Sequence, residues 1–321
     1  MSLSKLVAVL LAMIVCLCAL ARAQDQYPSR MITIVVPITP GTTIDILARL
    51  YADKLAKKFG QQVVVSNRPG AGGLIAAQAV ANSPPDGYTV IFANSGHAIL
   101  GTLNKNLPFD PVRDFAGVAL VGEAPTIVTI PPSLGVSNLK EFVELAKAKP
   151  GTINYGSAGI GTATHLAGAY FALLTNTDLV HVPYTVSATI IADMLGGRIQ
   201  ASFVPMAFVL PLLQDNRLRA LAVSAKESVT DPIKIPTALS QGVDYQNATW
   251  YGILASAKTP RAALAVLHEG IAEASKDPEL QAKIRVQGID PRDIGLEKFD
   301  AHVANDMARL APLLKSIGER R

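Results

Sequence analysis

The first segment with residue types suited to ligand chemistry lies between a predicted strand and a predicted helix. The β-branched run Ile32–Val36 predicts a buried strand, and an apolar stripe from Ile44 to Phe59 predicts a helix. The connecting stretch, Pro37–Asp45, is rich in Thr, Pro and Gly. A helix start carries about half a positive charge and several unpaired N–H donors. This stretch is therefore suited to hold a carboxylate.

A second segment repeats this layout. Residues 153–155 predict a short strand, Gly156–Thr162 form a loop of Gly, Ser and Thr, and an apolar stripe follows from Ala163 to Leu174. Taken singly, Gly and Thr at a helix start are ordinary capping residues. Taken together, the two loops predict that each belongs to a different α/β domain and that both face one cleft.

Two other motifs resemble enzyme motifs but are incomplete. Ser95 and His97 follow a predicted strand at 89–93, but the Gly-x-Ser-x-Gly elbow of a hydrolase is missing. The glycines of Gly70–Gly73 lack the third small residue of a dinucleotide fingerprint, because Ile75 stands there. We therefore predict a protein without catalytic residues, cofactor or metal, and keep a secreted hydrolase or nucleotide-dependent enzyme as an alternative.

The start of the chain has the pattern of a secretory signal. Lys5 precedes an uninterrupted apolar run, Leu6–Leu20, and Ala-Arg-Ala then fits a signal peptidase site. The run is shorter than the roughly twenty residues of a membrane-spanning helix, which is the alternative interpretation. We predict that residues 1–23 are a cleaved signal peptide and that the protein is periplasmic. Cys16 and Cys18 both lie in this segment, so the remaining chain can form neither a disulfide nor a thiolate site.

The charge balance limits the classes of partner. Removal of the predicted signal takes away two of the 29 Lys and Arg, against 25 Asp and Glu, and leaves a formal charge of +2. This balance argues against nucleic acid and against a strongly basic membrane patch. About 300 residues, half of them apolar, suffice for two domains.

Two long extended stretches predict where the chain passes between the domains. Val118–Val121 and Ile127–Ile130 are consistent with one long strand that crosses, and Trp250–Ala255 is predicted as the return. We therefore assign 24–125 plus 252–321 to a discontinuous first domain and 126–251 to a second. The predicted fold class is α/β with two domains.

Further expectations concern the segment at 204–206 and the chain after the return strand. Val204–Met206 follows a predicted strand and is expected to be a ligand loop. The chain after the return strand is expected to be helical, with Pro312 as a kink or a terminator. The predicted helices are Ala262–Ala274, Leu280–Val286 and Phe299–Leu314.

Ten motifs along the chain form a specific combination. They are Tyr27–Arg30, Pro37–Asp45, Asn67–Gly73, Pro85–Thr89, Tyr155–Thr162, His165–Gly168, Val182–Tyr184, Asp193–Gly197, Leu218–Val223 and Pro232–Thr237. This combination resembles the Bug-type receptors, the substrate-binding proteins of tripartite tricarboxylate transporters. The resemblance implies a type II periplasmic binding fold that closes over a small organic acid and delivers it to the membrane components of such a transporter. It also implies that the loops at 37–45 and 157–165 hold one carboxylate between the domains.

Three positions depart from the family pattern. Thr42 and Val186 stand where glycine is common, and Val204 stands where an acidic residue is common. Without that acid an amino-acid ligand is disfavoured. Tyr184, Val204 and Phe208 are predicted to form an apolar wall for the body of an aliphatic or aromatic dicarboxylate.

The predicted site residues come from five short segments. They are Ile38, Thr39, Gly41, Thr42, Thr43 and Asp45; Ser95 and His97; Ser157, Gly161, Thr162, Ala163 and His165; Tyr184; and Val204, Pro205 and Phe208. Asp45 has a second interpretation, as a first-turn carboxylate that favours the helix dipole without touching any ligand. His165 has one too, as a packed histidine. We expect a monomeric receptor for a di- or tricarboxylate or an aromatic carboxylate, with a sensor for a membrane signalling partner as the alternative.

Overall fold

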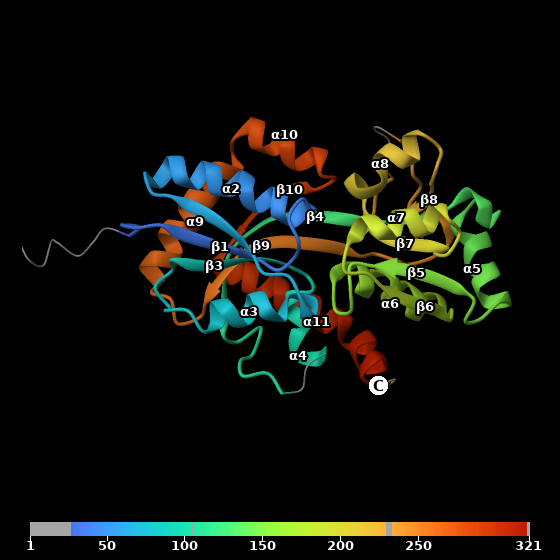
Figure 1. Cartoon of the computed structure of the whole chain (residues 1–321), viewed down its shortest axis with the longest axis horizontal. Coiled ribbons are helices and arrows are strands. Elements are labelled where there is room, and N and C mark those ends of the chain that lie inside the picture. The colour runs from blue at the N-terminus through green and yellow to red at the C-terminus, as the bar shows by residue number, and fades with distance from the viewer. Residues whose placement is uncertain (1–26, 104–105, 229–232, 320–321) are drawn as a thin grey trace, which may run out of the picture.

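The computed structural model of the chain, shown in Figure 1, describes residues 27–103, 106–228 and 233–319. The predicted signal peptide lies outside these ranges. Within them the chain forms two halves joined by long strands, the α/β arrangement that the sequence predicts (Figure 1). None of the helices in the described part is both long enough and apolar enough to cross a membrane.

The strands of the first half follow the order β2-β1-β3-β9-β4, with β10 on the far edge of β4. Their bounds are Ile32–Val36 for β1, Val63–Asn67 for β2, Thr89–Asn94 for β3, Phe115–Ile130 for β4, Ala248–Ser256 for β9 and Asp290–Gly295 for β10. β1 is parallel to both β2 and β3, so the carboxyl ends of these strands meet at one edge of the sheet. That edge carries the first predicted loop and the loop after β3.

The second half continues from β4 through β7, β5 and β6, and β8 also pairs with β4. The bounds are Ile153–Ser157 for β5, Leu179–Pro183 for β6, Ala201–Pro205 for β7 and Arg219–Val223 for β8. β5 is parallel to β6 and β7. The second predicted loop therefore also lies at the carboxyl edge of parallel strands.

One strand belongs to both halves, which confirms the predicted single crossing strand. β4 pairs with β9 from Phe115 to Pro125 and with β7 from Thr126 onward. β9 pairs with β4 from Ala248, so the chain has already returned to the first sheet four residues before the predicted boundary at 252. The exact domain limits remain a prediction.

Helices cover both faces of each sheet (Figure 1). Their bounds are Thr43–Phe59 for α2, Leu74–Ala81 for α3, Leu100–Leu103 for α4, Leu139–Ala148 for α5, Ala163–Thr175 for α6, Ser187–Leu195 for α7, Met206–Gln214 for α8, Arg261–Ser275 for α9, Pro278–Val286 for α10 and Leu296–Glu319 for α11. Short 3-10 turns span Ala71–Gly73, His97–Ile99, Pro132–Leu134 and Leu239–Gln241. α2, α9 and α10 share a core on one face of the first sheet, and α3 and α11 share a core on the other. In the second half α5 and α6 pack on one face and α7 and α8 on the other.

Three expectations for irregular segments were wrong. The expected ligand loop at 204–206 is the end of β7 and the first residue of α8, whose apolar sequence conceals any helical stripe. β10 is a strand although its sequence is polar, because it adds to the edge of β4. Of the two possibilities for Pro312, the terminator is the one that is wrong, because α11 continues to Glu319.

Asp45 anchors the loop that precedes α2. Its carboxylate is 2% exposed and accepts hydrogen bonds from the Gly41 N–H (2.9 Å), from the Arg49 guanidinium (3.0 and 3.1 Å) and from Asn67 Nδ2 (2.8 Å). Asn67 Nδ2 also donates to the Ile38 carbonyl at 3.0 Å. Burial raises the pKa of Asp45, but the bonds from Arg49, Gly41 and Asn67 outweigh it and hold the pKa below the ordinary 3.8.

We predict that Asp45→Asn lowers the free energy of unfolding at pH 7 by about 1.5–3 kcal/mol, the usual worth of hydrogen bonds to a charged group. A depressed folded pKa means that the stabilisation is present above the ordinary value and is lost as the pH falls through the folded value. Denaturant unfolding should therefore show a gap between variant and wild type that is constant from about pH 5 to 8 and shrinks below about pH 4.

Glu144→Gln, an exposed change on α5, is the control and should stay within about 0.5 kcal/mol of wild type at every pH. A gap for Asp45→Asn that is absent at pH 7, or that widens in acid, would contradict the assigned role of Asp45.

Candidate functional site

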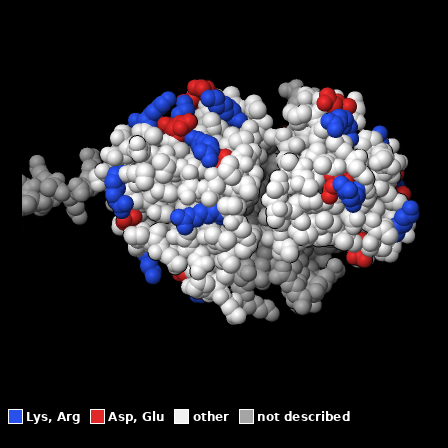
Figure 2. All heavy atoms as spheres, in the orientation of Figure 1, with Lys and Arg blue, Asp and Glu red and all other residues white. Residues whose placement is uncertain are grey.

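Two connected cavities lie between the halves, where the two predicted loops face each other. We call the first the α8 chamber; its volume is about 620 Å³ and its walls include Thr42, Thr162, Phe208 and Tyr251. We call the second the glycine-loop chamber; its volume is about 650 Å³ and its walls include the glycines of the Ala71–Gly73 turn. Both are lined by Ile38, Thr39, Asn94, Ala158, Thr162 and Val186. Figure 2 shows a furrow between the halves, bordered mainly by uncharged residues on that face.

The start of α2 presents its backbone to the α8 chamber. Thr42 is the N-cap residue, but its hydroxyl donates to the Thr39 carbonyl (3.0 Å) and makes no capping bond to the helix. Thr39, Gly41, Thr42 and Thr43 all line the chamber. The donors of the first helical turn are therefore directed toward the space between the halves.

The start of α6 faces the same space from the second half. Thr162 Oγ1 accepts from the His165 N–H (3.4 Å) and donates to the Gly159 carbonyl (2.7 Å). The Ala158 N–H donates to Thr164 Oγ1 at 3.0 Å. These bonds fix a turn that brings Thr162, Ala163 and Thr164 to the wall of the α8 chamber.

The halves approach each other most closely where side chains are missing. A Cβ added to Gly96 would lie 3.0 Å from the Gly161 carbonyl oxygen, and one added to Gly72 would lie 2.7 Å from the Ile160 carbonyl oxygen. Gly72 also has φ +66°, a conformation that favours glycine. Glycine at both positions lets the backbone of the first half touch the loop before α6.

Most of the predicted residues line the two chambers. Ile38, Thr39, Gly41, Thr42, Thr43, Thr162, Ala163, Val204, Pro205 and Phe208 line the α8 chamber, and His97 and Tyr184 line the glycine-loop chamber. Phe208 reaches the wall from α8 rather than from the expected loop. Tyr184 donates a hydrogen bond to Asp193 at 2.6 Å, which holds its ring in place.

Five predicted residues are not among the lining residues and support the loops from behind. Asp45 anchors the first loop, and Ser95 Oγ accepts from the Trp250 N–H at 3.1 Å. Ser157 Oγ lies 2.6 Å from His181 Nε2, and the Gly161 N–H donates to His165 Nδ1 at 3.2 Å. For Asp45 and His165 the structure therefore favours the second interpretation, a packed support.

Two histidines near the loops, His97 and His181, are held neutral. Burial lowers the pKa of His97 to about 4, and its Nε2 lies 2.8 Å from the Pro111 carbonyl oxygen. Burial and then the neighbouring His165 lower the pKa of His181 to about 3. The rings of His165 and His181 lie 4.0 Å apart. The walls of both chambers, as far as the structure describes them, therefore offer neutral donors at neutral pH.

Sequence reasoning missed residues on the central strands and on α10. Asn94, Thr126, Thr249, Tyr251 and Val286 line the α8 chamber. Thr249 and Tyr251 belong to a strand in which β-branched and aromatic residues are ordinary, so their types gave no signal. Strand alternation could have separated them from Trp250, whose side chain packs against Phe299 instead.

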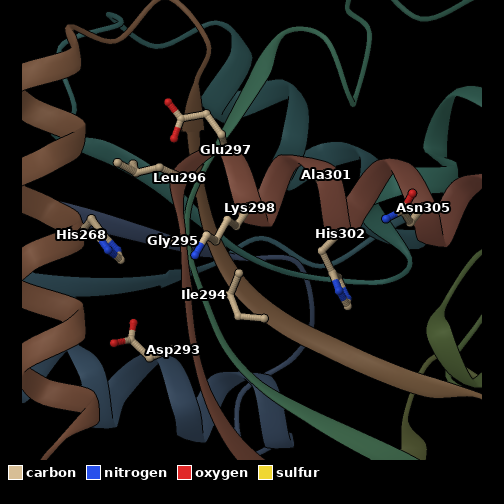
Figure 3. A pocket seen from close by; sticks show the side chains of 10 residues that line it. All are labelled: His268, Asp293, Ile294, Gly295, Leu296, Glu297, Lys298, Ala301, His302 and Asn305. Atoms are coloured by element: carbon tan, nitrogen blue, oxygen red, sulfur yellow. The ribbon is translucent and has the colours of Figure 1, made fainter.

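A third hollow lies away from the loops, between α9, β10 and α11. Figure 3 shows its side chains, among them His268, Asp293, Lys298 and His302. It is an open, mixed-charge surface of the first half, and no residue of the paired loops lines it. Among the described residues no group of three or more His, Cys, Asp and Glu could hold a metal ion.

Comparisons with known proteins agree with this geometry. The family described as tripartite tricarboxylate transporter family receptor matches residues 47–319. Protein BugT of Bordetella pertussis is 30% identical over 92% of this chain and 92% of its own. The structure of R. palustris Rpa4515 with adipate is 31% identical, covers 91% of this chain and 99% of its own, and superimposes with a TM-score of 0.82. MatC from Rhodopseudomonas palustris with bound malate is 26% identical, covers 90% and 100%, and gives a TM-score of 0.79.

The matched segment is most of the chain, and it includes the greater part of both halves and the start of α6. This chain belongs to the family of tripartite tricarboxylate transporter receptors.

Proposed function

We propose that this chain is a periplasmic solute-binding receptor that captures a small organic carboxylate between two closing domains. It then delivers the ligand to the membrane components of a tripartite tricarboxylate-type transporter. The proposed domains are 24–125 plus 252–321 and 126–251, and the proposed receptor is a monomer. The membership in a receptor family and the periplasmic binding protein BugD, 27% identical with a TM-score of 0.82, support the location and the role.

The observation that carries the proposal is the meeting of two helix starts across one cavity. α2 comes from the first half and α6 from the second, and Thr42 and Thr162 line the same α8 chamber. Each start contributes about half a positive charge and free N–H donors. An anion between them would interact with both halves at once, which couples binding to closure.

The chemistry of the relatives favours a carboxylate as that anion. Two similar structures, Rpa4515 with adipate and MatC with bound malate, hold dicarboxylic acids. A carboxylate held by a few charge-assisted hydrogen bonds of about 1.5–3 kcal/mol each can reach micromolar affinity, about −8 kcal/mol. No charged side chain is needed for this.

We predict that some carboxylic acids stabilise the purified protein and that Thr162→Glu abolishes the effect. A ligand at a hundred times its Kd adds about 2.7 kcal/mol to the free energy of unfolding, which raises the Tm by a few degrees. A glutamate at position 162 places a like charge beside the bound carboxylate and should weaken binding by at least about tenfold. Thermal unfolding against aliphatic, aromatic and tricarboxylic acids measures both effects.

The control is Asn138→Glu, which alters the N-cap of α5 far along the chain from both loops. It should lower the Tm and leave the ligand-induced rise unchanged. Chromatography of the released acid checks the enzyme alternative, because a receptor returns its ligand unaltered. Protein freed of carried ligand that responds to none of the acids would refute the proposal.

We also predict that Gly96→Ala weakens carboxylate binding by opposing closure. Gly96 has φ −64°, so alanine fits its backbone, but the added Cβ would lie 3.0 Å from the Gly161 carbonyl oxygen of the other half. The added Cβ would also lie 3.2 Å from Asn94 Oδ1 within the first half, but that side-chain contact is the same in the open and closed forms. The crowding against Gly161 exists only when the halves are together, so it shifts the population toward the open form. Isothermal titration should show a Kd raised several-fold.

Gly101→Ala provides the matched control, because the added Cβ would meet only Pro111 at 3.4 Å, within the first half. Equal Kd values for Gly96→Ala and wild type would show that closure at this contact does not limit binding.

A further inference from the structure

Two largely buried residues, Thr249 and Tyr251, line the α8 chamber with hydroxyl groups that have no hydrogen-bond partner among the described residues. Thr249 is 6% exposed and Tyr251 is 4% exposed, and both line the chamber from β9. Among the described residues neither hydroxyl makes a hydrogen bond, whereas the neighbouring Thr126 Oγ1 accepts one from Asn247 Nδ2 at 3.0 Å. Residues two apart on a strand point to the same face, so the two hydroxyls lie on one side of β9.

A hydroxyl that faces a cavity without a protein partner is open to a ligand. Most buried polar atoms in proteins are paired, and neither of these oxygens is among the fully enclosed, unpaired polar atoms of the described residues, so both are reached from the chamber. Burial raises the pKa of the Tyr251 phenol, which therefore keeps its proton and is available as a donor. Two hydroxyl donors on one side of a strand that lines a cavity suit an oxygen acceptor that enters from outside.

The chamber walls around these two hydroxyls are apolar and suit a ligand with an apolar body and a polar end. Val204, Phe208, Leu210 and Val286 line the same chamber. α8 also begins here after Pro205, which cannot cap a helix through its side chain, and Ala207 of its first turn lines the chamber. The partial positive charge of this helix start adds to the two hydroxyl donors.

We infer that Tyr251 and Thr249 bind a second oxygen-bearing group of the ligand, at the end opposite the carboxylate held by the paired loops. The inference rests on the proposed function and assigns two specificity-determining residues to that site. The substrate is then a carboxylate with a second carboxylate, or another strong oxygen acceptor, separated from the first by an apolar body. A plain fatty or benzoic acid would leave both hydroxyls unpaired.

The test compares acids that differ only in the second group. Suitable pairs are adipate with hexanoate and terephthalate with 4-methylbenzoate, titrated calorimetrically into protein freed of carried ligand. Wild type should prefer the doubly substituted acid of at least one pair by tenfold or more. Tyr251→Phe and Thr249→Val, each close in shape to the native residue, should each reduce that preference several-fold, because they weaken binding of the doubly substituted acid more than binding of the simpler one.

Tyr51→Phe is the matched control, because Tyr51 is a buried tyrosine whose hydroxyl lies 2.8 Å from Ser275 Oγ, outside both chambers. It should leave the preference intact, and thermal unfolding confirms that all variants fold. If the protein binds carboxylates without preferring the doubly substituted acid, or if both β9 variants keep that preference, this inference is wrong and the proposed function still stands. The absence of binding to every acid would overturn both.

Discussion

The structure depends on one electrostatic constraint, the approach of two helix starts that carry the same partial charge. α2 and α6 each bring about half a positive charge to the α8 chamber, from opposite halves. Like partial charges repel, so this arrangement alone opposes closure. An anion between them turns the repulsion into two attractions. Under the proposed function, a ligand would therefore decide which conformation is stable, and the energy for closure would come from its interaction with both helices.

The rest of the fold allows this approach without side-chain obstruction. Gly72 and Gly96 bring the backbone of the first half against the loop before α6, where any Cβ would crowd a carbonyl oxygen. On another side, Leu310 and Leu313 of α11 share a small apolar core with Leu166 of α6. Arg309 extends this contact, since it lies over the Tyr170 ring. α11 thus keeps the halves in contact on this side, and the loops form the contact between the halves at the chambers.

Much of this arrangement was predictable from local signals. The strand, loop and helix at 32–59 and at 153–175 follow from β-branched runs, glycine and helical stripes, each of which acts over a few residues. The missed elements depend on distant partners. β10 is a strand because β4 offers it an edge, and α8 is helical although Pro211 interrupts its pattern. The roles of Thr249 and Tyr251 also depend on which cavity their strand faces, which no local pattern encodes.

A cleft of neutral donors also suits a receptor that must release its ligand. A buried ion pair is costly to form because both charges lose their hydration, and removal of one partner leaves the other charge uncompensated in the interior. Here the ion pair of Asp45 with Arg49 lies behind the first loop and shapes it without lining the chambers. Backbone N–H groups and hydroxyls give smaller, additive contributions, several of which are lost together once the halves separate. Under the proposed function, opening the cleft would therefore remove most of the affinity in one step, which transfer to a membrane partner would require.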